Sequence, residues 1–260
     1  MKVALFQYDV LTDPKQNLLK IQEYAASLKG KGVDLLVLPE LCLSAYIPDL
    51  STITFHENDE IFRSLMECAK EFGGYILGSF IIQDGHTRHN RALYIGADGI
   101  VARRDKQRLF TYWEEHNHVL PGLYTDSVEV HSWKISPFIC YELRFPELFR
   151  AVKGNHLMIV IAQWPSSRKD HWLTLLKARA IENQCYVIGV NRVGVFKERE
   201  YAGNSVLYGP KGETILQLDG HLEELQMATI EMEPLEKYRE EFPALRDAEL
   251  VIVESFKEGG

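Results

Sequence analysis

The sequence predicts one α/β domain in which helices cover a mixed β-sheet core. Patterns typical of strands and of helices alternate along both halves of the chain, and turn dipeptides separate neighbouring strand patterns near its middle. The 260 residues exceed a usual domain length of about 150, but α/β folds of about 250 residues often form a single domain. Because no linker, low-complexity tract or repeat interrupts the chain, we assign residues 1–260 to one domain.

The first half of the chain opens with a strand and a helix. The helix is predicted from Asp13 to about Lys29, since Asp13 is a favourable N-cap, Pro14 suits the first turn, and Gly30 and Gly32 provide an end. The full set in this half is strands over 3–8, 34–40, 75–83, 91–97 and 100–106 and helices over 13–29 and 59–72.

Two features of these strands bear on the topology. DLLVLPE (34–40) is an almost unbroken apolar run, which is typical of a strand buried on both faces. Asp84-Gly85 and Asp98-Gly99 separate the later strands and predict tight hairpin turns. The sheet is therefore expected to be mixed.

The second half repeats the alternation without repeating the sequence. Its predicted strands cover 135–139, 157–162, 186–191, 205–208, 213–218 and 226–231, and its helices cover 146–152 and 168–184 and start again at about 234. LMIVIA (157–162) is again apolar throughout, and a Gly-Pro-Lys-Gly turn joins the strands at 205–208 and 213–218.

Composition narrows the classes of partner. Lys and Arg number 29 against 37 Asp and Glu, and the net charge of −8 disfavours nucleic acid and anionic membranes as partners. The four cysteines form no CxxC pair, so we expect reduced thiols in a cytoplasmic protein. The N-terminus enters a strand pattern without signal-peptide features, and no apolar run approaches the ~18 residues that a membrane span needs.

Three reactive side chains fall at the ends of predicted strands. Glu40 closes DLLVLPE, Lys106 closes IVARRDK and Cys140 closes ISPFIC. In open α/β sheets, ligands tend to bind beyond the carboxyl ends of the strands. We therefore expect these side chains to contribute to a functional site.

The thiol of Cys140 would need activation, and its nearest polar neighbours in sequence are Glu142 and Arg144 rather than a histidine. A free thiol has a pKa of about 8.5, so only a small part is thiolate near pH 7. A carboxylate can act as general base and a lysine can stabilise an oxyanion, so Glu40 and Lys106 would allow acyl transfer without histidine. The structural alternatives are a buried cysteine, a helix-start glutamate and a lysine in an exposed basic run.

The stretches that carry these residues resemble the signature blocks of the nitrilase superfamily, the carbon–nitrogen hydrolases. The matching blocks, in order, are LPEL at 38–41, RDKQRLF at 104–110, ICYELRFPE at 139–147 and further stretches at 162–172, 177–194 and 237–248. The later blocks look most like the ω-amidase (2-oxoglutaramate amidase) branch. The resemblance implies a four-layer αββα sandwich and an amidohydrolase that releases acid and ammonia through a cysteine thioester.

The resemblance also implies roles for individual positions. Glu40 corresponds to the general base, Lys106 to the oxyanion-stabilising lysine and Cys140 to the nucleophile. A second glutamate of the family precedes a Pro-Gly or similar pair, and in WEEHNHVLPG the best match is Glu115, with Glu114 as the alternative.

The same branch implies a short dicarboxylate monoamide as substrate, such as 2-oxoglutaramate or 2-oxosuccinamate. The backbone N–H of Tyr141 would be a second oxyanion donor, and Trp164 is expected near the site. Arg144 and Arg168 are candidates to bind the free carboxylate of the substrate. For Arg144 we favour a pairing with a nearby acid that braces the nucleophile turn, and Arg168 could equally start the long helix.

Two positions depart from the family pattern. Arg108 stands where the second block usually has histidine, which puts a supporting contact in doubt. Gln163 stands where asparagine is common, which could alter the substrate pocket.

Two other functions remain open from the sequence. Another carbon–nitrogen hydrolase, acting on a nitrile, a carbamoyl amine or another aliphatic amide, would carry the same Glu–Lys–Cys set. A non-catalytic binding protein could also keep the fold, although all four catalytic positions are retained. The resemblance implies that no metal or organic cofactor is needed, and His116-Asn117-His118 lacks the partners of a zinc motif. The resemblance further implies a homodimer or higher homo-oligomer, with a C-terminal extension from about residue 232 packing on the domain or on a partner subunit.

Overall fold

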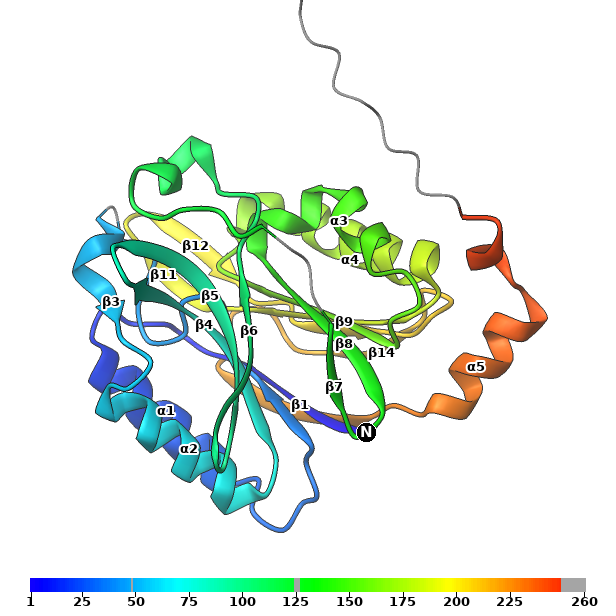
Figure 1. Cartoon of the computed structure of the whole chain (residues 1–260), viewed down its shortest axis with the longest axis horizontal. Coiled ribbons are helices and arrows are strands. Elements are labelled where there is room, and N and C mark those ends of the chain that lie inside the picture. The colour runs from blue at the N-terminus through cyan, green and yellow to red at the C-terminus, as the bar shows by residue number, and fades with distance from the viewer. Residues whose placement is uncertain (48, 124–126, 249–260) are drawn as a thin grey trace, which may run out of the picture.

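The computed structural model describes residues 1–47, 49–123 and 127–248, and its core is a four-layer αββα sandwich (Figure 1). Two β-sheets face each other at the centre. Helices α1 (Pro14–Ala26) and α2 (Glu60–Phe72) cover the outer face of one sheet. Helices α3 (Pro146–Ala151) and α4 (Lys169–Asn183) cover the outer face of the other. The predicted four-layer α/β fold is confirmed.

The first sheet mixes parallel and antiparallel strands in the order β15-β1-β2-β4-β5-β6, with β3 beside β4. Its strands are β1 (Lys2–Gln7), β2 (Leu35–Val37), β3 (Thr54–Phe55), β4 (Tyr75–Asp84), β5 (Thr87–Gly96), β6 (Gly99–Asp105) and β15 (Glu224–Thr229). β1, β2 and β4 are parallel, whereas β4, β5 and β6 form consecutive antiparallel hairpins. The hairpins predicted at Asp84-Gly85 and Asp98-Gly99 are therefore confirmed.

The second sheet has the order β14-β13-β10-β9-β8-β7. Its strands are β7 (Val128–Val130), β8 (Trp133–Ile139), β9 (Leu157–Ala162), β10 (Tyr186–Asn191), β13 (Val206–Tyr208) and β14 (Thr214–Gln217). β8, β9 and β10 are parallel and form the centre of the sheet. The remaining strands, β11 (Val193–Phe196) and β12 (Arg199–Ala202), form a separate hairpin.

The alternation of side chains along the central strands fills a core on both faces of each sheet. In β1, Ala4 and Phe6 belong to the core under α1 and α2, whereas Val3 and Leu5 belong to the core between the sheets. β9 alternates in the same way between the inter-sheet core and the core under α4. A strand buried on both faces needs an apolar residue at every position, which explains runs such as LMIVIA.

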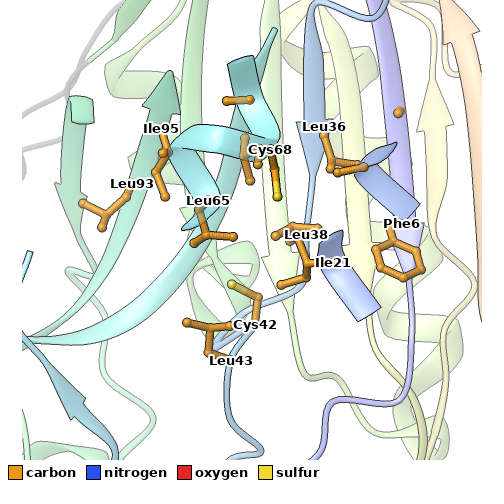
Figure 2. Packing of buried hydrophobic residues seen from close by; sticks show 14 of the residues in the cluster. Phe6, Ile21, Leu36, Leu38, Cys42, Leu43, Leu65, Cys68, Leu93 and Ile95 are labelled. Atoms are coloured by element: carbon orange, nitrogen blue, oxygen red, sulfur yellow. The ribbon is translucent and has the colours of Figure 1, made fainter. Parts of the chain in front are cut away.

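Figure 2 shows the core between the first sheet and its helices. Ile21 of α1 and Leu65 of α2 gather with Leu36 of β2 and Leu93 of β5. The thiol of Cys68 lies in the same cluster. Cys42 is buried there too, and Cys185 is buried under α4, so these three cysteines serve as small apolar side chains.

Helix α1 begins as predicted but ends earlier. Its N-cap is the side chain of Asp13, which accepts a hydrogen bond from Lys15 N at 2.9 Å. The helix ends at Ala26 rather than at about Lys29. Beyond it the chain continues in tighter turns, and Gly30 and Gly32 adopt positive φ angles of 72° and 66°, which end the right-handed winding.

The segment after β15 packs on the second sheet and α4. Helix α5 (Met232–Glu241) buries Leu235, and the Arg239 guanidinium donates to the backbone oxygens of Gly154, Asn155 and Gln184. None of the helices among the described residues is long and apolar enough to cross a membrane.

Short and irregular strands are what the sequence pattern misses. β3, β7 and the β11–β12 hairpin are not predicted, and β15 begins before its predicted range. β3 and β7 have only two and three residues, and the β11–β12 hairpin lies outside the two main sheets, so these strands carry little of the apolar alternation on which the prediction depends.

Candidate active site

Strand ends from both sheets meet in one cleft. Glu40 lies after β2 and Lys106 directly follows β6, both in the first sheet, whereas Cys140 directly follows β8 in the second. All three line the same cleft. The structure therefore brings together the three reactive side chains selected at strand ends, and it does so across the interface between the sheets.

A buried network of two carboxylates and one ammonium lies at the cleft, and Glu40 and Lys106 are its members that line the cleft wall. Lys106 Nζ lies 3.0 Å from Glu40 Oε1 and 3.0 Å from Glu115 Oε1. Asn90 Nδ2 donates to the same two oxygens at 3.0 and 3.1 Å. The exposed fractions of Glu40, Lys106 and Glu115 are 1%, 1% and 0%. Glu114, the alternative second glutamate, is exposed and makes none of these contacts.

The two carboxylates keep Lys106 charged. Burial alone would lower the pKa of Lys106, but the negative charges of Glu115 and Glu40 outweigh it and hold that pKa well above its usual value. Glu115 is fixed in turn by the backbone N–H of Phe110, which donates to Oε2 at 2.7 Å. The result is a rigid, water-excluded cation.

The backbone presents Cys140 in a constrained conformation. Its φ angle is +48°, a region that residues other than glycine rarely adopt, at the start of the short 3₁₀ turn Cys140–Arg144. Burial raises the pKa of the Cys140 thiol well above its usual value, and the charge of Glu40 raises it further, against the opposing effect of Lys106. The resting residue is therefore a thiol beside a carboxylate that can accept its proton.

Glu142 does not activate Cys140, although it lies close in sequence. Its carboxylate accepts two hydrogen bonds from Arg104, at 2.7 and 2.8 Å, and both side chains are buried. The backbone N–H groups of Ile139 and Gln107 also donate to it, each at 2.7 Å. Glu142 thus ties the nucleophile turn to β6.

The predicted brace exists, but its arginine is not the expected one. The favoured pairing of Arg144 with a nearby acid is not found among the described residues. The carboxylate of Glu142, two residues before Arg144, is already paired with Arg104. Arg144 instead lies over the ring of Trp164, at 4.7 Å from the centroid, and donates to His171 Nδ1 at 3.3 Å. It lines the cleft and is available to a ligand.

Arg168 and Trp164 also line the cleft. Arg168 is the residue before α4, so it both starts the long helix and faces the site. Its backbone oxygen accepts a hydrogen bond from Trp164 Nε1 at 2.9 Å. Burial lowers the pKa of Arg144, and the positive charge of Arg168 lowers it further, so the two cations repel each other across the cleft.

Gln163 supports the candidate base. Its backbone N–H donates to Glu40 Oε2 at 3.1 Å, and its Nε2 donates to the backbone oxygens of Glu40 and Ser44 at 3.0 and 3.1 Å. Its Oε1 accepts from Tyr46 N and from Arg192, both at 3.1 Å. This departure from the family pattern thus belongs to the network that orients Glu40.

Three side chains of the site are not predicted from the sequence: Asn90, Arg104 and Tyr46. Asn90 shares the inter-sheet face of β5 with Ala92 and Tyr94, and Arg104 occupies the inter-sheet face of β6. Asn90 and Arg104 could have been found from the sequence, because each is a polar residue on the buried face of a strand. Tyr46 lies in a loop and carries no such signal.

Other candidates lie outside the cleft. Arg108 is about half exposed and its Nη2 lies 3.8 Å from Glu147 Oε1, so it does not replace a histidine contact inside the site. His118 lies 3.4 Å from Asp49, and the described residues contain no group of three or more His, Cys, Asp or Glu side chains arranged for a metal.

A larger cavity, of about 760 Å³, lies beside β4, β5 and β6. Arg91 pairs there with Glu57, Asp84 and Asp105, and Arg103 also pairs with Glu57. Since each of these charged side chains already has a partner of opposite charge, we assign the cavity no part in the chemistry.

Comparison with known proteins identifies the family. Residues 2–240 match the family model of the carbon-nitrogen hydrolases. The chain belongs to this family. It is therefore an enzyme of the class that hydrolyses carbon–nitrogen bonds other than peptide bonds, which confirms the reaction class predicted from the sequence.

Individual relatives agree over nearly the full length. The chain is 35% identical to omega-amidase YafV of Escherichia coli (strain K12), covering 96% of this chain and 97% of that protein. It is 31% identical to 2-oxoglutaramate amidase of Bacillus subtilis (strain 168), covering 94% and 96%. Among solved structures, XC1258 from Xanthomonas campestris, a CN-hydrolase superfamily protein with an arsenic adduct in its active site, superimposes with a TM-score of 0.92 at 31% identity, covering 98% of this chain and 99% of that one.

Proposed function

We propose that this carbon–nitrogen hydrolase is an ω-amidase. It would cleave the terminal amide of a short dicarboxylic acid monoamide, such as 2-oxoglutaramate or 2-oxosuccinamate, to the acid and ammonia. The observation that carries the proposal is that the buried Glu40 and Lys106 and the partly exposed Cys140 line one cleft, which also holds two guanidinium groups. The similarity to omega-amidase YafV and to a 2-oxoglutaramate amidase supports the substrate class.

In the first half of the proposed reaction, Glu40 takes the proton from Cys140 Sγ as the sulfur attacks the amide carbon. The amide oxygen becomes an oxyanion near Lys106 and the backbone N–H of Tyr141. The C–N bond then breaks, and Glu40 returns the proton to the leaving nitrogen, which departs as ammonia. The product of this half is a thioester on Cys140.

In the second half, Glu40 accepts a proton from water as the water oxygen attacks the thioester carbon. The C–S bond breaks, and the proton returns to Sγ through Glu40. Glu115 holds Lys106 in place and helps to position the water. No other reactant is needed, since water supplies the atoms that replace ammonia.

The substrate carboxylate is assigned to Arg144 and Arg168. Both line the cleft, and neither forms an ion pair with an acidic side chain among the described residues. Two cations that repel each other without a bound anion favour an anionic ligand between them, and guanidinium groups suit a carboxylate because they can donate in parallel.

The test is ammonia release from 2-oxoglutaramate, 2-oxosuccinamate, succinamate, glutamine, asparagine and a carbamoyl amino acid, with Cys140→Ala as control. Preference for the two oxo-acid monoamides, lost in the variant, is expected. Turnover confined to another compound would retain the hydrolase chemistry and discard the ω-amidase assignment. Absence of turnover with all of them would contradict the proposal and favour a binding role.

The anion site is tested with a charged and an uncharged amide of similar length. Arg144→Met and Arg168→Met are each expected to lower kcat/KM for succinamate by ~10–10²-fold, the usual effect of losing a charged hydrogen bond. Turnover of butyramide should change by less than ~3-fold. Arg108→Met is the matched control, because Arg108 does not line the cleft. Equal losses on both amides would contradict carboxylate binding.

We further propose that the enzyme acts in the cytoplasm as a homodimer or higher homo-oligomer. Its four cysteines are free thiols, which suits a reducing compartment. Exposed apolar side chains on the helical side of the second sheet, Ile181 on α4 and Phe242 after α5, offer contacts to a second copy. Light scattering on the full chain, with Ile181→Glu for comparison, measures the assembly, and a wild-type monomer would contradict it.

A further inference from the structure

The hydroxyl of Tyr46 is a buried donor with nothing to donate to. The residue is 8% exposed, and its hydroxyl oxygen has no hydrogen-bond partner among the described residues. It lines the catalytic cleft together with Glu40, Lys106 and Cys140. A buried polar group left unpaired costs about 1–3 kcal/mol, so folding alone does not account for this hydroxyl.

The surroundings of Tyr46 hold the hydroxyl in place. Its backbone N–H donates to Gln163 Oε1 at 3.1 Å, and its ring packs on Trp113 with 5.3 Å between centroids. Tyr46 also belongs to a small apolar cluster with Leu41 and Val119. The side chain is therefore a fixed feature of the cleft wall.

Lys106, the oxyanion donor implied by the family resemblance, has its N–H donors already engaged by carboxylate oxygens. An ammonium group has three N–H donors. Lys106 Nζ already lies 3.0 Å from Glu40 Oε1 and 3.0 and 2.9 Å from the two oxygens of Glu115. An oxyanion would have to compete with carboxylates for these donors, so the site needs a donor that is not already engaged.

We propose that the Tyr46 hydroxyl donates a hydrogen bond to the oxyanion formed from the amide oxygen, beside Lys106 and the Tyr141 N–H. The inference rests on the proposed amide hydrolysis. Tyr46 is the one cleft hydroxyl among the described residues that is both buried and unpartnered. A neutral, pre-positioned donor of this kind stabilises developing negative charge without reorganisation.

The protonation state of Tyr46 agrees with a donor role. Burial raises the pKa of Tyr46 above its usual value, and the charge of Glu115 raises it further, against the effect of Lys106. The hydroxyl therefore keeps its proton throughout the neutral range. The influence of both charged groups also places the hydroxyl close to the catalytic network.

The first test is the kinetics of Tyr46→Phe, which removes the hydroxyl and keeps the ring on Trp113. A donor that acts only in the transition state predicts a ~10²-fold fall in kcat for succinamate with KM within ~3-fold. Tyr94→Phe is the matched control, because the Tyr94 hydroxyl is also buried and unpartnered but lies outside the cleft. An unchanged kcat in Tyr46→Phe, or a rise in KM alone, overturns the proposal.

The second test separates the oxyanion from the nucleophile. Alkylation of Cys140 by iodoacetamide forms a C–S bond and releases iodide, without an oxyanion, so its rate in Tyr46→Phe should stay within ~3-fold of wild type. Alkylation that slows as much as turnover would assign Tyr46 to positioning the thiol, and would overturn the proposal.

The third test does not depend on amide turnover. Succinic semialdehyde, the aldehyde counterpart of succinamate, can form a thiohemiacetal with Cys140: Sγ bonds to the carbonyl carbon, the π bond of the carbonyl opens onto its oxygen, and Glu40 takes the thiol proton. The former carbonyl oxygen then lies in the oxyanion position. Tyr46→Phe should weaken its binding by ~10-fold or more, measured by calorimetry. If the wild type cleaves no amide but this loss is seen, amidase function fails and the donor assignment stands; equal binding overturns the donor assignment alone.

Discussion

The buried pair Arg104–Glu142 should make a large contribution to stability that depends on both partners. Glu142→Leu would leave the Arg104 guanidinium buried without its counter-charge and would withdraw the acceptor from the backbone N–H groups of Ile139 and Gln107. Breaking a buried pair in this way costs about 3–5 kcal/mol, and each stranded donor adds about 1 kcal/mol.

Because neighbouring effects are not fully additive, we expect the free energy of unfolding to fall by about 5 kcal/mol. An unfolding entropy of about 2.1 cal/mol/K per residue gives roughly 0.55 kcal/mol/K for this chain length, so Tm should fall by roughly 9 °C. Urea unfolding followed by circular dichroism measures the first quantity, and a thermal scan measures the second.

Two further variants decide whether the buried charge is the cause. Arg103→Leu breaks the neighbouring pair with Glu57, whose arginine is 47% exposed, and should cost no more than about 1 kcal/mol. The double variant Arg104→Leu/Glu142→Leu removes the unpaired charge and should recover at least ~2 kcal/mol relative to Glu142→Leu. The reasoning is refuted if Glu142→Leu costs no more than Arg103→Leu, or if the double variant recovers nothing.

Three other outcomes are expected. Burial and the charge of Glu40 raise the pKa of Cys140, so Glu40→Gln should shift the titration of the Cys140 thiol to lower pH. Ultraviolet difference absorbance, with Cys140→Ala as the reference, measures this titration, and an unchanged titration would contradict the coupling. Glu115→Gln should lower kcat by ~10²-fold or more, whereas Glu114→Gln should change it by less than ~2-fold, and equal effects would contradict the assignment of the second glutamate to Glu115. Burial lowers the pKa of His156, so the native state binds fewer protons than the unfolded chain and stability should fall as pH drops below about 6.5; His156→Asn should flatten that slope in urea titrations at pH 7 and 5.5.

The sequence predicts the framework of this protein well because the framework follows from local patterns. Apolar runs such as LMIVIA fix the central strands, and turn dipeptides such as Asp84-Gly85 fix the hairpins between them. Strand ends then place Glu40 and Lys106 at one edge of the first sheet and Cys140 at the end of a strand of the second sheet, since parallel strands of one sheet end together.

Pairings between distant polar side chains lie beyond such patterns. Glu142 has an arginine two residues away in sequence, yet its partner is Arg104, which the fold brings from another sheet. Asn90 contacts Glu40 and Glu115 from β5, and its only signal in the sequence is that it lies on the same buried strand face as Ala92. Chain distance does not reveal these contacts, because they depend on how the two sheets are aligned.

That alignment is what the catalytic geometry requires. The candidate base and the lysine belong to the first sheet, and the nucleophile belongs to the second, so the distance between the reacting groups is set by sheet packing. Apolar packing is non-directional and tolerates small slides, whereas a catalytic site must hold its groups to within about 0.5 Å. The directional contacts across the interface are polar: Arg104 of β6 holds Glu142 beside the nucleophile, and the N–H of Gln163 beyond β9 holds Glu40. These buried polar groups therefore fix the register in which the base can reach the thiol, which explains why an otherwise apolar interface retains them.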